Sequence, residues 1–233
     1  MINLADITGL AGVTLAITAS LLLVPPIRRL KRIHLGLLMS ATAIVVAVPM
    51  GILPIAAYVR SFFGDLSITT NVFLVLAIFT HMSGRRPVDE KQKLAINGLI
   101  VVTAVVYYPL ALGIGPFDPY RLGYGSLWFL TGLLMLALGA WAVRYYLISI
   151  CIALSVVAHA MAWYESTNLW DYLLDPLVSV YALVAVLSGG LRAITHPDPF
   201  FPALKRDKHL VHSTHLEPEF DLPVGRIHTD TAQ

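Results

Sequence analysis

The chain has 233 residues, of which 57% are hydrophobic and only 13% are charged. Soluble domains carry about 25% charged residues, so this composition predicts that the excess apolar surface faces lipid rather than water. A chain of this length suits one helical bundle without a second globular domain, and its basic residues fall in short connections, which excludes a nucleic-acid-binding surface.

Apolar runs close to the 20 or so residues that a membrane span needs recur along the chain. We therefore expect an all-α fold, a polytopic integral membrane bundle with seven transmembrane helices near residues 7–24, 35–59, 68–82, 94–114, 126–143, 145–163 and 173–193. Pro49 and Pro54 predict a kink in the second helix. The fifth and sixth runs meet at Arg144 and predict a tight antiparallel hairpin. We expect two parts: a transmembrane domain, 1–194, and a cytoplasmic tail rich in proline and histidine, 195–233.

The basic residues separate into two unequal sets when the connections are counted alternately. One set contains only Arg60 and Arg121, and the other contains Arg28, Arg29, Lys31, Arg32, Arg85, Arg86, Lys91, Lys93, Arg144, Arg192, Lys205, Arg206, Lys208 and Arg226. Cytoplasmic loops hold the excess of Lys and Arg. This distribution predicts an external N-terminus, a cytoplasmic C-terminus and, for localisation, a bacterial inner membrane.

Residues 163–176, WYESTNLWDYLLDP, place aromatic rings beside carboxylates at the end of an apolar run. This pattern is typical of either an interfacial anchor or a polar ligand site. Our candidate catalytic residues are His159, Asp171 and Asp175. Our candidate ligand-binding residues are Glu165, Trp163, Trp170, Arg121 and Asp118.

Each candidate has a structural alternative. His159 lies one helical turn before this stretch and is either a proton-handling group or a neutral histidine bonded to a neighbouring helix. Asp175 precedes Pro176, so it is either one of a pair of catalytic carboxylates or the cap of the last helix. Arg121 is a candidate partner for one of the acids, in what is otherwise a turn rich in tyrosine.

Prolines in the external halves of the predicted spans favour splayed helices around an outward-facing cavity, although prolines can equally shape tight packing. These residues are Pro49, Pro54, Pro109 and Pro176.

Metal and cofactor chemistry is not predicted. His34 and His81 are expected at one side of the membrane and His159 at the other, so the three cannot share one ion or one haem. The single cysteine, Cys151, allows no internal disulfide and is expected to be a small buried packing residue.

Three functions remain open. The first, which we favour, is a non-catalytic small subunit or scaffold of a larger membrane complex, with the lipid bilayer and other membrane subunits as partners. The second is an enzyme of the outer leaflet that acts on a lipid or lipid-linked sugar through His159 and nearby carboxylates. The third is a transporter of small solutes.

Overall fold

The computed structural model describes residues 4–28 and 32–195. The fold is mostly helical, which confirms the predicted all-α class. The helices belong to a unit that extends to Leu191, except for the last four residues of the final helix. Apart from Thr195, the predicted tail with its histidines and prolines lies outside the described residues.

Each of the seven predicted apolar runs overlaps one long helix among the described residues. These helices are α1 (Leu4–Leu21), α3 (Arg32–Ala47), α5 (Ile68–Ser83), α6 (Glu90–Ala111), α7 (Leu127–Ala142), α8 (Tyr146–Ala160) and α10 (Pro176–Thr195). Four short elements connect them: α2 (Pro25–Arg28), α4 (Ile55–Phe63), the 3-10 helix η1 (Pro119–Gly123) and α9 (Leu169–Leu173). In the described ranges, α6 alone is both long and apolar enough to cross a membrane, and the other six are apolar over shorter stretches.

The second predicted helix, 35–59, is not one kinked helix. Helix α3 ends at Ala47, and a two-stranded hairpin of β1 (Pro49–Met50) and β2 (Leu53–Pro54) separates it from α4. Two prolines without N–H groups flank Gly51, whose φ of 83° is accessible mainly to glycine, so the chain turns sharply instead of bending. Of the four prolines expected to kink long helices, only Pro109 lies inside one.

Local signals set the helix boundaries. Ser67 caps the start of α5 by accepting a hydrogen bond from Thr70 N, and Gly84 ends the helix in the left-handed conformation at φ 66°. Asp89 caps α6 in the same way through Gln92 N. Arg144, also at a positive φ, makes the turn between α7 and α8, which contact each other as the predicted antiparallel hairpin.

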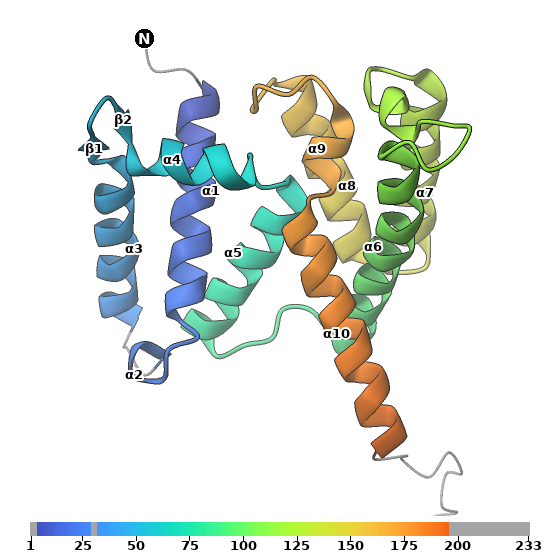
Figure 1. Cartoon of the computed structure of the whole chain (residues 1–233). Coiled ribbons are helices and arrows are strands. Elements are labelled where there is room, and N and C mark those ends of the chain that lie inside the picture. The colour runs from blue at the N-terminus through green and yellow to red at the C-terminus, as the bar shows by residue number, and fades with distance from the viewer. Residues whose placement is uncertain (1–3, 29–31, 196–233) are drawn as a thin grey trace, which may run out of the picture. The chain divides into compact units, whose positions relative to one another are not determined.

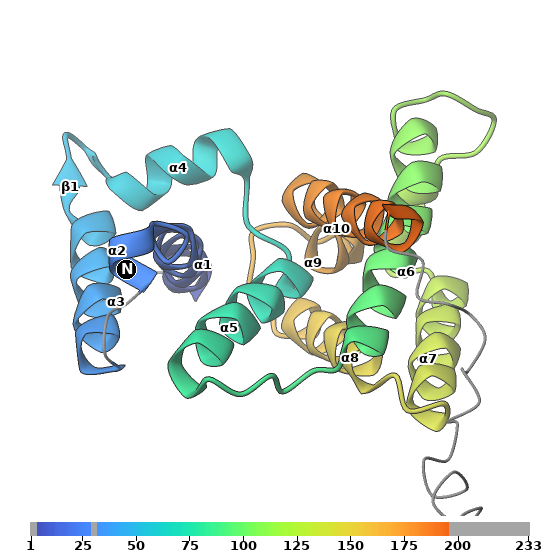
Figure 2. The same ribbon diagram turned by 90° about the horizontal axis from the view of Figure 1, so that it is seen from below.

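Helices α1 and α3 lie side by side with α4 running across α1, and this group meets the remaining helices chiefly through α1 against α5 (Figures 1 and 2). The hairpin, α4, η1 and α9 lie at the end where α1 begins, which we name the α9 end (Figure 1). Helix α2 and the connections from α5 to α6 and from α7 to α8 lie at the opposite end (Figure 1).

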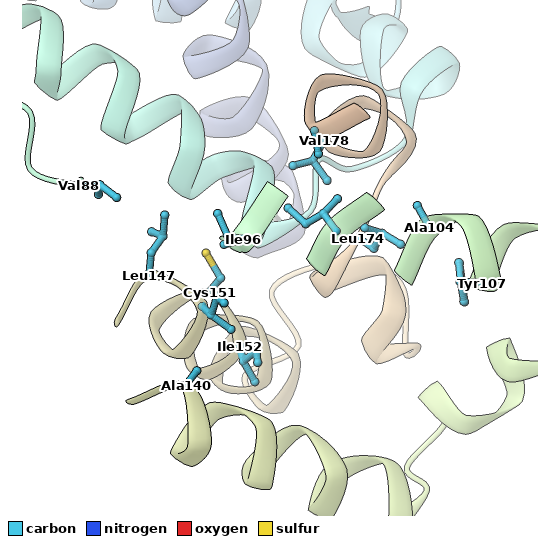
Figure 3. Close-up of a cluster of buried hydrophobic side chains, with 13 residues drawn as sticks. Val88, Ile96, Ala104, Tyr107, Ala140, Leu147, Cys151, Ile152, Leu174 and Val178 are labelled. Carbon is cyan, nitrogen blue, oxygen red and sulfur yellow. The ribbon is translucent and has the colours of Figure 1, made fainter. Parts of the chain in front are cut away.

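The largest buried cluster lies between α6, α8 and α10 (Figure 3). It contains Ile96, Ile100, Ala104, Tyr107, Leu147, Ile148, Cys151, Ile152, Leu174, Val178 and Ala182. Cys151 is 3% exposed within it, which confirms the predicted packing role. The cluster holds α8 and α10 against α6 and so positions the loops of the α9 end.

Candidate functional site

The segment from Trp163 to Pro176 forms the centre of the α9 end. The start of α5 and the loop that follows α6 and contains η1 lie beside it. Its helix α9 contacts α5, α8 and η1. We name the side chains of this segment, together with those that they contact in α4, α5 and η1, the α9-end cluster. The hydrogen bonds of the cluster show how each predicted site residue is held.

Asp175 is the most deeply buried carboxylate described, at 6% exposure. Its Oδ1 accepts from Val178 N at 2.7 Å, so it caps α10 with Pro176 in the first turn, as one of the two interpretations predicted. Its Oδ2 accepts from Ser67 N at 2.7 Å and from Thr70 Oγ1 at 2.5 Å. One carboxylate therefore joins the starts of α5 and α10, and its oxygens are occupied by donors from the fold.

Asp171 belongs to a different set of contacts. Its Oδ2 accepts from Tyr120 Oη at 3.2 Å and from Ser166 Oγ at 2.5 Å. Helix α10 begins only at Pro176, so Asp171 and Asp175 do not share the face of one helix. The two carboxylates therefore belong to separate hydrogen-bonded groups.

Asn168 and Trp170 fasten η1 to α9. The Asn168 side chain is fully buried, donates from Nδ2 to Tyr120 O at 2.9 Å and accepts from Trp170 N at 2.9 Å. Trp170 donates from Nε1 to Pro119 O, and its ring lies between Tyr107 and Phe129. This tryptophan is held on both faces, so it offers no open platform for a ligand.

Gly123 is required at this junction because the two backbones approach closely. A Cβ at this position would lie 1.8 Å from Asn168 Oδ1, which is far inside contact distance. Asn168 and Gly123 were not among the predicted site residues. An Asn two residues before a Trp and a Gly in a turn are too common to single out without the contact between them.

Tyr164 and Tyr172 stack with ring centroids 4.7 Å apart. Tyr164 Oη donates to Leu66 O at 2.7 Å and accepts from Asn71 Nδ2 at 3.1 Å. Burial raises the pKa of Tyr164 above its ordinary value, and the nearby charge of Asp65 acts in the same direction. The phenol therefore stays protonated and connects the loop before α9 to the start of α5.

His159 lies in the last turn of α8, partly buried. Its Nε2 is 3.0 Å from Thr167 O, which can only accept, so this nitrogen carries the proton. The imidazole packs edge-on against Tyr172, with ring centroids 5.2 Å apart. Neither Asp171 nor Asp175 contacts it through a hydrogen bond, and its partner is a backbone group of the adjoining loop.

Arg60 of α4 provides the positive charge of the cluster. Its guanidinium makes two parallel bonds to Asp65, at 2.7 and 3.0 Å, and lies 3.9 Å from Glu165. Burial opposes the charge, but the bonds and charge of Asp65 outweigh it and raise the pKa of Arg60. The group packs on the bare backbone of Gly9, where a Cβ would lie 2.5 Å from Arg60 Nε.

Arg121 does not fill the predicted role. Its side chain is exposed, and within residues 4–28 and 32–195 it forms no ion pair with an acid. Asp118, also exposed, caps η1 by accepting from Tyr120 N at 2.9 Å. Glu165 is 78% exposed at its side chain, and Trp163 contributes its carbonyl oxygen, which accepts from Thr8 Oγ1 at 2.7 Å.

The structure thus brings most of the predicted residues to one end of the helices but assigns them to three separate groups. Asp175 belongs with α5, Asp171 and Trp170 with η1, and Glu165 with Arg60. No three or more His, Cys, Asp or Glu side chains gather as a metal site among the residues with described positions.

A cavity of about 490 Å³ lies elsewhere, between α1, α5, α6 and α10, and none of the predicted site residues lines it. Its walls are mostly apolar, with Thr70 toward the α9 end and Lys93 toward the opposite end. Comparison with family models, curated proteins and solved structures gave no match to this chain.

Proposed function

We propose that this chain is an integral membrane protein of the bacterial inner membrane and a non-catalytic subunit or scaffold of a larger membrane complex. In this proposal it crosses the bilayer seven times, with the N-terminus outside and the C-terminus in the cytoplasm. The α9 end then faces outward.

The placement in a membrane is supported by the pattern of exposed side chains and of charge. Helix α7 exposes large apolar residues along its length, among them Leu127 at 76%, Trp128 at 87% and Trp141 at 63%. Such exposure is costly in water and favourable in lipid. Lys and Arg dominate the connections opposite the α9 end, as the cytoplasmic side of a membrane protein requires.

Helix α4 is consistent with seven crossings because it runs across α1 instead of alongside it. Phe62 near its end is 86% exposed, while Arg60 turns toward the acidic residues of the α9 end. An amphipathic helix of this kind lies in the interface between lipid and water.

The observation that carries the non-catalytic role is that the candidate catalytic groups are already occupied. Asp175 accepts three hydrogen bonds from backbone and hydroxyl donors, Asp171 accepts two, and His159 donates to a carbonyl. A catalytic acid or base must reach the proton that it transfers, and these groups instead join segments of the fold. The cluster therefore serves as a rigid external platform.

Two experiments test this proposal. Alkaline carbonate extraction should leave the full-length protein in the membrane fraction, and its release would contradict the membrane placement. Purification of the tagged protein from its native membrane in mild detergent should yield one larger assembly of fixed stoichiometry. A monodisperse protein free of other subunits would contradict the subunit role.

His159→Ala and Asp171→Asn separate this role from the enzyme of the outer leaflet. Both variants should assemble like the wild type, without a change in the lipids of the cell. Accumulation of one lipid or lipid-linked sugar in cells that carry either variant, with the assembly intact, would support the enzyme instead.

A further inference from the structure

The cavity between α1, α5, α6 and α10 has the size of a ligand site. Its volume of about 490 Å³ lies inside the range of about 300–1,000 Å³ that small-ligand pockets occupy. Phe73 of α5 and Tyr181 of α10 both line it and contact each other edge-on. Other apolar residues of the wall include Ala16, Leu66, Leu74, Leu76, Ala77 and Val178.

One buried polar side chain in this wall lacks a partner. Asn97 of α6 is 7% exposed, lines the cavity, and its Oδ1 forms no hydrogen bond. Buried polar atoms without a partner are rare in folded proteins, and Asn97 is the one asparagine among the residues that line this cavity. An amide in an otherwise apolar wall selects a ligand with a long apolar part and one hydrogen-bonding group.

We propose that this cavity binds one anionic membrane lipid, with an acyl chain along α5 and its polar backbone at Asn97. Thr70 and Thr80, ten residues apart on α5, both line the cavity, which at about 1.5 Å per residue corresponds to about 15 Å of length. An extended chain fits such a space. The proposal rests on the membrane placement above but not on the subunit role.

Charge gives the lipid its orientation. Lys93 lines the cavity one helical turn before Asn97, at the end of the helices opposite the α9 end. Residues 84–93 contain Arg85, Arg86, Lys91 and Lys93 against Asp89 and Glu90. Lys93 and Arg86 lie 3.0 and 3.5 Å from Glu90, and the positive charge that exceeds the two acids of this loop favours an acidic head group.

A partner helix fits less well than a lipid. A helix about 15 Å long and about 10 Å wide occupies roughly 1,200 Å³, whereas the proposal places only one acyl chain of the lipid in the cavity of about 490 Å³. A free anion would leave the long apolar wall without contacts. The lipid is the ligand that uses both the wall and the polar end.

Native mass spectrometry of the full-length protein tests the proposal. The protein is reconstituted with phosphatidylcholine containing a minor fraction of phosphatidylglycerol, then released into the gas phase from mild detergent. The wild type should retain one phosphatidylglycerol per chain. Asn97→Leu should lower occupancy about two- to tenfold through loss of one hydrogen bond. Lys93→Gln should lower the preference for phosphatidylglycerol over phosphatidylcholine about fivefold.

Ala77→Phe fills the cavity and should remove the bound lipid. Ala153→Phe, at an exposed alanine of α8 that does not line the cavity, is the matched control and should retain it. Unfolding temperatures of all four variants show whether the fold is kept. Equal lipid retention by Ala77→Phe and Ala153→Phe overturns the site. An unchanged preference for phosphatidylglycerol in Lys93→Gln overturns the anionic selectivity. A bound peptide in place of lipid overturns the ligand class. If no lipid is retained but the protein resists carbonate extraction, the lipid site is refuted and the membrane placement is not.

Discussion

Replacing Asp175 by Asn should weaken the fold more than any other conservative change at an acidic residue of the α9 end. The carboxylate accepts from Val178 N on one oxygen and from Ser67 N and Thr70 Oγ1 on the other. An amide keeps a single acceptor, so one of these sets is lost and the new NH₂ group faces donors. The cap contributes about 1 kcal/mol, and each buried bond to the charged carboxylate contributes about 1.5–3 kcal/mol. One set is lost, and the bonds of the retained set weaken because the amide oxygen carries no charge. We expect a loss of about 2–4 kcal/mol in the free energy of unfolding.

Reversible unfolding in mixed micelles, followed by circular dichroism, measures this loss. Asp118→Asn is the matched control because that exposed carboxylate also caps a helix but accepts only from Tyr120 N, so its loss should stay below about 1 kcal/mol. A double-mutant cycle with Thr70→Val should give a coupling of about 1 kcal/mol or more. Equal losses in the two asparagine variants, together with zero coupling, would refute the role assigned to Asp175.

Three further predictions concern the same end of the molecule. Gly123→Ala should destabilise the fold by about 1–3 kcal/mol, because its methyl group would overlap Asn168. Gly132→Ala, with open space around it in α7, should stabilise the fold by up to about 1 kcal/mol. Equal unfolding free energies of the two variants would contradict the close approach at Gly123. Arg60→Lys keeps the charge but loses the two parallel bonds to the Asp65 carboxylate, so thermal unfolding should occur at a lower temperature. An unchanged unfolding temperature would show that the second of these bonds adds no stability. The pKa of Tyr164 is raised in the folded state, so its contribution to stability is complete below the ordinary pKa of about 10 and is lost as the pH rises further, with a slope of at most about 1.4 kcal/mol per pH unit. In Tyr164→Phe, the free energy of unfolding should fall less steeply with rising pH than in the wild type. An identical fall in both proteins would argue against a buried neutral phenol.

Local signals in the sequence predicted the helices and the Asp175 cap well. Asp followed by Pro favours a helix start, and the partner of the cap, Val178 N, is supplied by the helix itself. The other partners, Ser67 and Thr70, lie more than 100 residues away, and no local pattern connects them to Asp175. The cluster could therefore be predicted as a location but not as a set of contacts.

The prediction of one helix over residues 35–59 was wrong for a different reason. The hydrophobicity of this run continues through the hairpin, so a search for apolar length joins α3 and α4 into one helix. Pro49, Gly51 and Pro54 carry the opposing signal, because they remove backbone donors and permit a positive φ within six residues. The backbone requirement outweighs hydrophobic continuity wherever several such residues occur together.

The hydrogen bonds of Asp175 and Tyr164 also constrain the order in which the protein is completed. Ser67 N, Thr70 Oγ1 and the carbonyl of Leu66 bond to groups 98 to 108 residues later in the chain. During synthesis, helices α1 to α6 leave the ribosome before these partners do. The start of α5 therefore keeps unpaired polar groups until the last helix arrives, and a chain that stops before residue 164 leaves them exposed for quality-control proteases to recognise.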